Sequence, residues 1–433
     1  MIAIGFCAGN GTWVAQTDVA RGGVVERSTL CNSGLLAGLS RGSQSAKTQI
    51  RFASIGFMGP SLIQPDLPLA TPPAELRNVL LVPWGLNPPR GARRAAGLFD
   101  ADGQYIMAGT CLRYGDDALT IEPEFDPPTE VETLTGRWLY GGLLYGHFGH
   151  FLCESTSRLW ALDANFGEYD GVVWLPKVQL GHPAKMVRPY PPFFEALGFP
   201  GMPLRAPQKI TKIETLVIPE QGFGIGLMAS GRPQYRDFMR SHLGRDIAPA
   251  PIEKLYVSRS KLPSKRGSVL VEQQIEQEMA QAGYLIFHPE AHPIAEQIAY
   301  YKGADYIVGL DGSALHMAAM VAKPSAKVAI LNRGPSQNID DYARQFHHFC
   351  GIDVSKISAV SAYWYMAGSR VKKRETHAEL DLEKIGNVLA ELGFIGQKPW
   401  EPAVPADIAS QIAEREANSG QALQRYEVAQ ADD

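Results

Sequence analysis

Cysteine is scarce in this sequence, and long apolar runs are missing from it. The chain has five cysteines, and no two of them form a C-x-x-C pair. This usage excludes a disulfide framework or a zinc ribbon and indicates a reducing compartment. No run of about 18 apolar residues occurs, so we expect no membrane-spanning helix. The apolar start at residues 1–7 is short and carries no basic residue, which argues against a signal peptide.

The sequence also has no excess of positively charged residues. Lysine and arginine together number 41 against 45 aspartates and glutamates, which gives a formal net charge of -4 at pH 7. A general nucleic-acid binder needs a basic surface, so this class of protein is excluded and any basic site must be local. Hydrophobic residues make up 45% of the chain and charged residues 20%, as is typical of a globular enzyme.

The length and the proline pattern of the chain predict two domains with flanking segments. At 433 residues the chain is too long for one ordinary core. A proline-rich break, Ile247-Ala-Pro-Ala-Pro251, separates two regions of different pattern. We therefore expect an irregular or β-rich segment at 1–75, a first domain at 76–246, a second domain at 252–360, and helices with a polar tail at 361–433.

The second domain shows a regular alternation of strand and helix patterns. Strands are expected at 254–258, 284–287, 305–309 and 327–331, and helices at 271–282, 293–302 and 313–322. This alternation predicts a parallel sheet with helices on both faces. Ligands of such sheets bind beyond the carboxyl ends of the strands, so residues at those ends are site candidates. In the first domain we expect strands at 78–83, 171–175 and 214–218, and helices at 149–163 and 235–243.

The strand at 305–309 leads into a glycine turn and a small-residue helix. The stretch Val308-Gly-Leu-Asp-Gly-Ser-Ala-Leu-His316 leaves backbone N–H groups at a helix N-terminus, where an anion such as phosphate is favoured. Gly312, Ser313 and Ala314 are small enough to let a phosphate reach the backbone. The alternative is an ordinary strand-to-helix turn, in which glycine and serine are also common.

Basic side chains follow the strand at 254–258. Arg259 ends that strand, and Lys261, Lys265 and Arg266 come shortly after it. A planar guanidinium can bind two oxygens at once, so Arg259 and Arg266 are predicted to complete a diphosphate site. The alternative for such a loop is solvated surface, which we favour for Lys261.

Carboxylates follow the strand at 284–287. Glu290 is the candidate for binding ribose hydroxyls, because a carboxylate at a strand end can accept both of them. Glu296 is instead expected in the first turn of a helix, where its charge complements the helix dipole.

His150 and Glu154 are the catalytic candidates of the first domain. In a helix over 149–163 they lie one turn apart on one face. An imidazole near a helix N-terminus is kept neutral, as a general base must be, and Glu154 could hold its tautomer or be the base itself. The alternative is a structural histidine. The spacing also resembles a metal site, but no third ligand and no strand-end Asp-x-Asp accompany it, so we expect no metal.

Together these blocks resemble glycosyltransferase family 61, in its bacterial capsular-polysaccharide branch, over roughly residues 78–350. Three blocks carry the resemblance, and their order and spacing make it specific. They are His150-Phe-Leu-Cys-Glu154 with Arg158-Leu-Trp160, Tyr256-Val-Ser-Arg259 with Arg266 and Glu272, and Pro289-Glu290 with Glu296-Gln297 and the turn at 309–315.

The resemblance implies a GT-B architecture, in which two Rossmann-like domains face each other across a cleft. It also implies inversion at the anomeric carbon without an obligatory metal or any cofactor. The donor would be a nucleotide sugar, with a UDP-linked sugar favoured, and the acceptor a glycan. Carried over to this sequence, Arg259, Arg266 and Gly312–Ala314 would hold the donor diphosphate and Glu290 its nucleoside. His150 or Glu154 would face the acceptor hydroxyl.

The family also implies a role in capsular or surface polysaccharide biosynthesis. We therefore expect a cytoplasmic protein with no nucleic-acid partner. Peripheral association with membrane polysaccharide machinery, at the inner face of the membrane, is compatible with this expectation.

Three positions depart from the family pattern. Asp311 stands where the family often has histidine, Val271 replaces a frequent asparagine, and Thr156-Ser157 replaces a common Leu-Pro. A carboxylate beside a diphosphate is repulsive unless it is turned away or protonated. The departures at Asp311 and Val271 favour an alternative function, a non-catalytic GT-B-like scaffold that binds sugar or nucleotide in a polysaccharide assembly complex. A nicotinamide-dependent oxidoreductase built on Gly222-Phe-Gly-Ile-Gly226 is a weaker hypothesis, because that spacing departs from the dinucleotide fingerprint.

Overall fold

The computed structural model describes most of the chain beyond its first 66 residues. The described residues are 67–69, 72–84, 93–114, 117–126, 130–177, 183–263, 267–335, 338–369 and 376–428. All of them fall within one compact unit, Phe57–Asp433. The irregular segment expected at 1–75 therefore lies outside the described residues, apart from 67–69 and 72–75.

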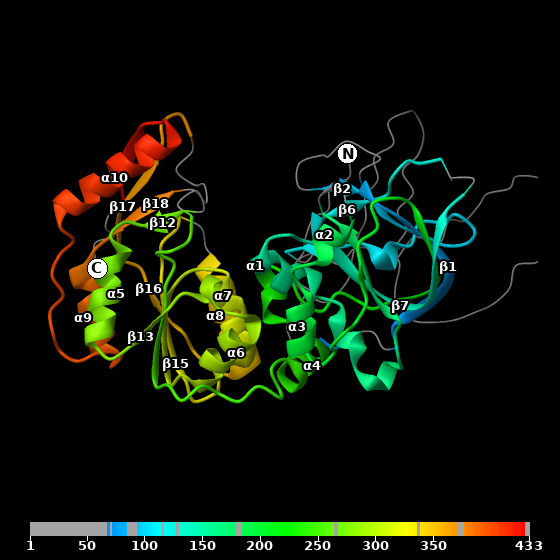
Figure 1. Cartoon of the computed structure of the whole chain (residues 1–433), viewed down its shortest axis with the longest axis horizontal. Helices are drawn as coiled ribbons and strands as arrows, with labels where there is room; N and C mark the ends of the chain where they lie inside the picture. Colours follow the sequence, from blue (N-terminus) through cyan, green and yellow to red (C-terminus); the bar gives the residue numbers. More distant parts are fainter. Residues whose placement is uncertain are drawn as a thin grey trace, which may run out of the picture. The chain divides into compact units, whose positions relative to one another are not determined.

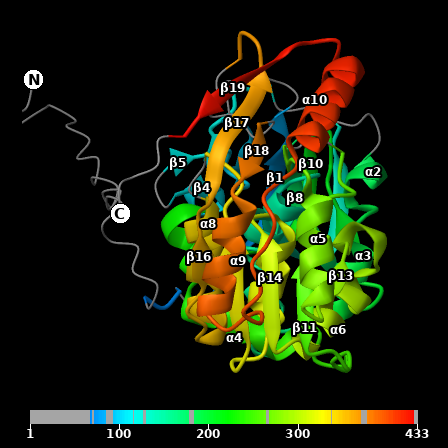
Figure 2. The ribbon, with the colours of Figure 1, turned by 90° about the vertical axis from the view of Figure 1, so that its left-hand side faces the viewer.

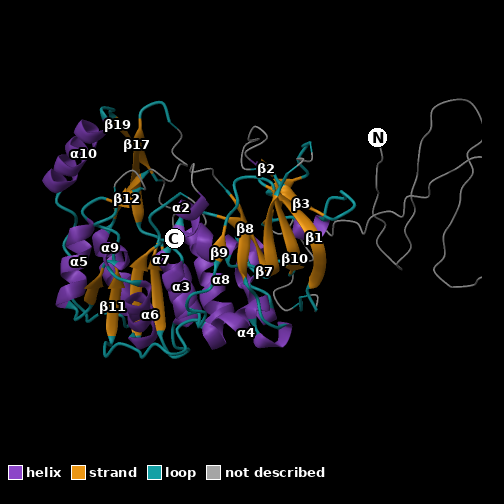
Figure 3. Ribbon diagram, turned by 45° about the vertical axis from the view of Figure 1, so that its right-hand side comes forward, coloured by secondary structure: helices purple, strands orange, loops and turns teal. Residues whose placement is uncertain are grey.

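The first sheet, which includes β1 and β7 in Figure 1, is mixed. Its strand order is β3-β1-β10-β7-β8-β9, and Figure 3 labels these strands. Its strands are β1 (Ala74–Val82), β3 (Gly97–Phe99), β7 (Glu132–Leu144), β8 (Gly171–Pro176), β9 (Leu204–Arg205) and β10 (Thr211–Ile218). The β7, β8, β9 and β10 strands pair in parallel, whereas β1 is antiparallel to both of its neighbours. Every residue of β8 is buried, as expected of a parallel strand covered on both faces.

Shorter elements complete the region before residue 246. Two small strand pairs are formed by β2 (Arg94–Ala95) with β6 (Thr120–Ile121), and by β4 (Leu112–Arg113) with β5 (Asp117–Ala118). The helices are α2 (Pro183–Val187), α3 (Pro191–Ala196) and α4 (Pro233–His242). After β10 the chain forms a 3-10 turn at Gly226–Ser230, and no α-helix follows the strand directly. The Gly222–Gly226 stretch therefore lacks the strand-to-helix context of a dinucleotide site.

The second sheet is parallel throughout and has the order β13-β11-β14-β15-β16, and Figure 2 labels β13, β11, β14 and β16. Its strands are β11 (Lys254–Val257), β13 (Leu285–Phe287), β14 (Tyr306–Leu310), β15 (Lys327–Leu331) and β16 (Ser355–Ile357). The helices of this region are α5 (Glu272–Gln281), α6 (Ile294–Gly303), α7 (Ala314–Val321), α8 (Asn338–Cys350) and α9 (Leu382–Glu391). The prediction of an α/β protein with a parallel sheet is confirmed.

Successive residues of the second sheet face two different hydrophobic cores. Leu255 packs in the first core with residues of α6, α7 and α8, and Tyr256 packs in the second with residues of α5 and α9. The first core also contains Phe151 and Phe193 from the region before residue 246. Apolar packing is therefore continuous between the two sheets, and helices cover both faces of the second one.

The helix expected at 149–163 is not continuous. The chain forms α1 (Phe148–His150), then a π-helical turn at Phe151–Ser155, and then a 3-10 turn at Leu159–Leu162. Hydroxyl groups compete with the helical hydrogen bonds, since Thr156 Oγ1 donates to the Leu152 carbonyl at 2.6 Å. π-helical turns of this kind are rare and often occur at functional sites.

The region from 361 to 433, expected to hold helices and a polar tail, contains a third sheet as well. Figure 2 shows its strands β17 (Val360–Met366), β18 (His377–Leu380) and β19 (Leu423–Glu427), with α10 (Pro405–Ser419) beside them. The short β12 (Ser268–Val269) completes the order β12-β18-β17-β19. The sequence did not reveal β19 because most of its residues are exposed. Of the helices in the described ranges, none is long and apolar enough to cross a bilayer.

Candidate active site

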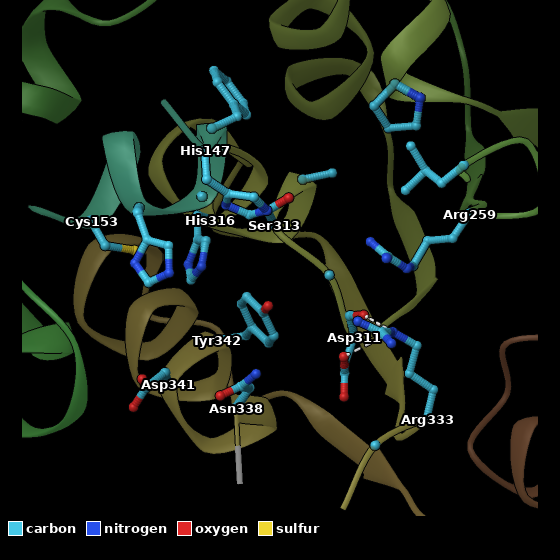
Figure 4. A pocket seen from close by; sticks show the side chains of 18 of the residues that line it. His147, Cys153, Arg259, Asp311, Ser313, His316, Arg333, Asn338, Asp341 and Tyr342 are labelled. Carbon is cyan, nitrogen blue, oxygen red and sulfur yellow. Dashed lines mark hydrogen bonds and ion pairs between the residues drawn. The ribbon is translucent and has the colours of Figure 1, made fainter. Parts of the chain in front are cut away.

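A cavity of about 540 Å³ receives residues from both sheet regions (Figure 4). Its lining includes Arg113, His147, Gly149 and His150 from the first region, and Ser258, Arg259, Glu290, Gly312, Ser313, Ala314, His316, Arg333, Asn338, Asp341 and Tyr342 from the second. The sequence-predicted residues His150, Arg259, Glu290 and Gly312–Ala314 therefore share one cavity. Arg266 lies outside the described residues.

The turn after β14 supplies backbone N–H groups to this cavity. Helix α7 begins at Ala314, and its N-cap residue Ser313 makes no side-chain capping hydrogen bond. Within the described ranges, no hydrogen-bond partner is present for the amides of Gly312, Ser313 and Ala314. A Cβ on Gly312 would lie 2.6 Å from Arg259 Nη1, so glycine lets the guanidinium approach the turn.

Arg259 stands at the carboxyl end of β11 and is held through its backbone. Its N–H donates to Glu272 Oε1 at 2.7 Å, and Ser258 Oγ donates to the same oxygen at 3.0 Å. Burial, reinforced by the nearby Arg333 cation, lowers the pKa of the Arg259 guanidinium to about 10. Its Nε is buried without a hydrogen-bond partner among the described residues. Lys261, predicted to be solvated, is exposed and absent from the cavity lining.

The departure at Val271 coincides with an unusual backbone conformation. Val271 has φ 52° and ψ 33°, in the left-handed region that asparagine and glycine adopt more readily than a β-branched residue. Its side chain is buried, and its N–H donates to Gln411 Oε1 at 3.1 Å. Packing and this hydrogen bond hold the strained residue in place immediately before Glu272.

Asp311 does not face the cavity as an isolated carboxylate. Arg333 Nε lies 3.2 Å from Asp311 Oδ1 and donates to the Asp311 carbonyl at 2.7 Å. The Asp311 side chain is only 2% exposed. Sequence reasoning missed Arg333, although it lies just past the predicted strand at 327–331, at the same edge of the sheet as Arg259.

Glu290 lies in a 3-10 turn, Pro289–Ala291, directly after β13. It is exposed and lines the cavity. Gln297 fixes this turn from α6, because its Nε2 donates to the carbonyls of Pro289 and His292 at 2.8 and 2.9 Å. Glu296 lies in the first turn of α6, as expected, and pairs with His292.

His150 and Glu154 contact each other as the sequence predicted. His150 Nδ1 lies 2.6 Å from Glu154 Oε2, and the His150 ring stacks on Tyr145 with centroids 5.0 Å apart. Arg113 donates to both oxygens of Glu154, from Nε at 2.9 Å and from Nη2 at 3.0 Å. Glu154 is 4% exposed and lies behind His150, away from the cavity lining. A carboxylate there accepts the Nδ1 proton and thereby fixes the tautomer of the His150 ring.

Two further members of the first sequence block have structural roles. Arg158 is buried, and its Nη2 donates to the Thr110 carbonyl at 2.9 Å. Trp160 Nε1 donates to the Glu220 carbonyl at 2.9 Å. These contacts tie the irregular helical segment to neighbouring loops.

His316 is a second histidine of the cavity, and its hydrogen bond fixes which ring nitrogen carries the proton. Its Nδ1 lies 2.8 Å from Gln345 Oε1, so this nitrogen carries the proton of the neutral ring. Burial lowers the pKa of His316 to about 4. His316 is therefore neutral at physiological pH and presents a proton acceptor at Nε2.

The two regions meet closely beside these histidines. A Cβ on Gly149 would lie 2.6 Å from Ser313 Cβ and 3.5 Å from a carbon of the His316 ring. Glycine at 149 therefore brings the backbone next to His150 into contact with the turn after β14.

Residues 148–329 match the family model described as Glycosyltransferase 61. The match includes His150, Arg259, Glu290 and Gly312–Ala314, and it stops before Arg333. The predicted resemblance to this family is confirmed over this span. No curated protein matches the chain. Among the described residues, no group of three or more His, Cys, Asp or Glu side chains is arranged to hold a metal ion.

Proposed function

We propose that this protein is an inverting, metal-independent glycosyltransferase with a GT-B arrangement of two Rossmann-like domains, 76–246 and 252–360. It moves a sugar from a nucleotide-sugar donor, with UDP as the favoured nucleotide, to a glycan acceptor in capsular or surface polysaccharide biosynthesis. The observation that carries the proposal is the shared cavity, into which anion-binding groups and an oriented histidine project from two regions (Figure 4). We also propose a cytoplasmic location, with peripheral attachment to the polysaccharide machinery at the membrane.

On the donor side, charge develops on the departing nucleoside diphosphate. Arg259 and the amides of Gly312–Ala314 stabilise this charge in a partly dehydrated site, where fixed donors act more strongly than in water. Glu290 accepts hydrogen bonds from the ribose. Because these protein groups neutralise the leaving group, the reaction needs no bound divalent cation.

On the acceptor side, His150 Nε2 takes the proton of the attacking hydroxyl. Glu154 then stabilises the imidazolium through its 2.6 Å contact with Nδ1, and Arg113 holds Glu154 in place. The hydroxyl attacks the anomeric carbon opposite the leaving diphosphate. The new bond forms as the sugar–phosphate bond breaks, so the configuration inverts in one displacement.

Thermal unfolding of the full chain with nucleotides tests the donor class. UDP, GDP, CMP, dTDP and NAD are compared, each with and without EDTA. A ligand at a hundred times its dissociation constant adds roughly 2.7 kcal/mol to the folded state, enough to raise the midpoint by a few degrees. We expect a rise with UDP that EDTA does not change. A rise with NAD alone would contradict a transferase, and a rise that EDTA abolishes would contradict metal independence.

Replacing His150 with alanine should lower kcat by roughly 10²–10⁴ while the nucleotide-induced rise in unfolding temperature persists, because general-base catalysis contributes about that much. The matched comparison is His147→Ala, since His147 lines the same cavity and its ring centroid is 5.5 Å from that of His150. Initial rates and the thermal shift are measured on both variants. A larger loss of kcat in His147→Ala than in His150→Ala would show that His147 is the general base instead of His150.

A further inference from the structure

Three neighbouring strands of the second sheet end at the same side of the cavity. Strands β11 and β15 flank β14 in the sheet, and all three run in parallel. Arg259 follows β11, the turn with Gly312 and Ser313 follows β14, and Arg333 lies just beyond β15. The amide-bearing turn therefore has one arginine on each flank, and both arginines line the cavity.

Arg333 is held by one edge of its guanidinium. Its Nε contacts both the carbonyl and the Oδ1 atom of Asp311. No hydrogen bond to either Nη atom of Arg333 is present within the described parts of the chain. Figure 4 shows the Asp311–Arg333 contacts, with Arg259 above them in this view. The free edge of Arg333 remains available to a ligand in the cavity.

The two guanidiniums are close enough to repel each other. The Arg333 charge contributes to the lowered pKa of Arg259, after the effect of burial. Asp311 supplies one negative charge against these two positive charges, and the unpaired amides of the β14 turn add positive potential. At the β14 turn, two guanidiniums therefore stand beside one adjacent carboxylate, and an anion bound between them would offset their mutual repulsion.

We propose that Arg333, positioned by Asp311, is the second arm of a diphosphate clamp, in which Arg259 and Arg333 each bind one phosphate across the β14 turn. The proposal rests on the proposed donor class and adds a residue beyond the matched span of 148–329. It makes the site selective for two linked phosphates over one, because a single phosphate cannot engage both guanidiniums fully. Asp311 then acts by orienting Arg333.

Calorimetric titration of the full chain with inorganic pyrophosphate and with orthophosphate tests this clamp. We expect the wild-type protein to bind pyrophosphate at least tenfold more tightly than orthophosphate. Arg333→Gln should weaken pyrophosphate binding tenfold or more and change orthophosphate binding less than threefold. Arg333→Lys, which keeps the charge but loses the planar fork, should recover only part of the preference. The matched control is Lys261→Gln, which removes an exposed charge near Arg259 and should change neither affinity.

The outcomes separate this inference from the proposed function. If the wild-type protein binds pyrophosphate and Arg333→Gln binds it equally well, the second arm is wrong while the transferase proposal stands. If the wild-type protein binds neither pyrophosphate nor any nucleotide, both proposals fail. If it binds a nucleotide but shows no preference for pyrophosphate, the clamp is overturned.

The Asp311 variants test the positioning role. Asp311→Ala should reduce the preference for pyrophosphate, because Arg333 loses its side-chain partner and keeps only the backbone carbonyl, whereas Asp311→Asn should keep part of the preference through the amide oxygen. If both variants instead bind both anions more tightly with an unchanged preference, Asp311 only opposes anion binding and does not orient Arg333. Circular dichroism confirms that each variant is folded before titration.

Discussion

Replacing Arg259 with glutamine is expected to lower kcat/KM at least a hundredfold without destabilising the protein. Loss of one charged donor from a dehydrated catalytic site typically costs about 3–4 kcal/mol of transition-state stabilisation. The unliganded fold gains little from this guanidinium, because its Nε is unpaired within the described residues and burial has lowered its pKa to about 10. Removing a desolvated charge that lacks a partner should leave the unfolding temperature unchanged or raise it.

Initial rates and thermal unfolding of Arg259→Gln, Lys261→Gln and the wild-type protein check this expectation. Lys261→Gln removes a charge two residues away, and we expect it to retain wild-type turnover because Lys261 is exposed and outside the cavity lining. Wild-type activity in Arg259→Gln would show that the diphosphate is held elsewhere. A large fall in unfolding temperature would show that Arg259 stabilises the fold.

Replacing Glu272 with glutamine is expected to remove a pH dependence from the stability of the protein. Burial raises the pKa of the Glu272 carboxyl from 4.5 to about 7, with nearby Glu276 adding to the rise. Between these two pH values the folded protein keeps a proton that the unfolded chain has released. The unfolding free energy of the wild-type protein therefore falls as pH rises from about 4.5 to about 7, and this contribution is constant above that range.

Glutamine does not titrate, so the comparison isolates one group. A shift of this size corresponds to about 3 kcal/mol. Relative to that of the wild-type protein, the unfolding free energy of Glu272→Gln should therefore increase by about 2–3 kcal/mol between pH 4 and pH 8, because only the wild-type protein loses stability over this range. Urea unfolding of both proteins at the two pH values measures the difference. A difference that does not change with pH would mean that Glu272 is ionised normally in the folded protein.

The second sheet was predicted from the sequence nearly strand by strand. The strand predicted at 327–331 is β15, Lys327–Leu331, and the strand predicted at 254–258 is β11, Lys254–Val257. These strands are buried on both faces, so they read as short continuous apolar runs between polar turns. Reasoning about strand ends then led to Arg259 and to Gly312–Ala314, which line the same cavity.

Residues brought in by distant or irregular segments could not be found in this way. Arg113 lies on the two-residue strand β4 and is 41 positions away from its partner Glu154 in the sequence. No local sequence pattern predicts this contact. The π-helical turn at Phe151–Ser155 is accompanied by a hydrogen bond from the Thr156 hydroxyl to the Leu152 carbonyl. The spacing of apolar residues does not predict such a hydrogen bond. Likewise, β19 is mostly exposed and owes its conformation to pairing with β17.

A Cβ added at Gly149 would lie 2.6 Å from the Cβ of Ser313, so the two segments touch with no room for one added methyl group. The spacing between the proposed base and the proposed phosphate anchor is therefore set by contact between the main chain at Gly149 and the first side-chain carbon of Ser313, and not by long side chains. A side chain at position 149 would push the two segments apart and move both groups at once. The donor and the acceptor must therefore fit a distance that glycine at this position keeps short.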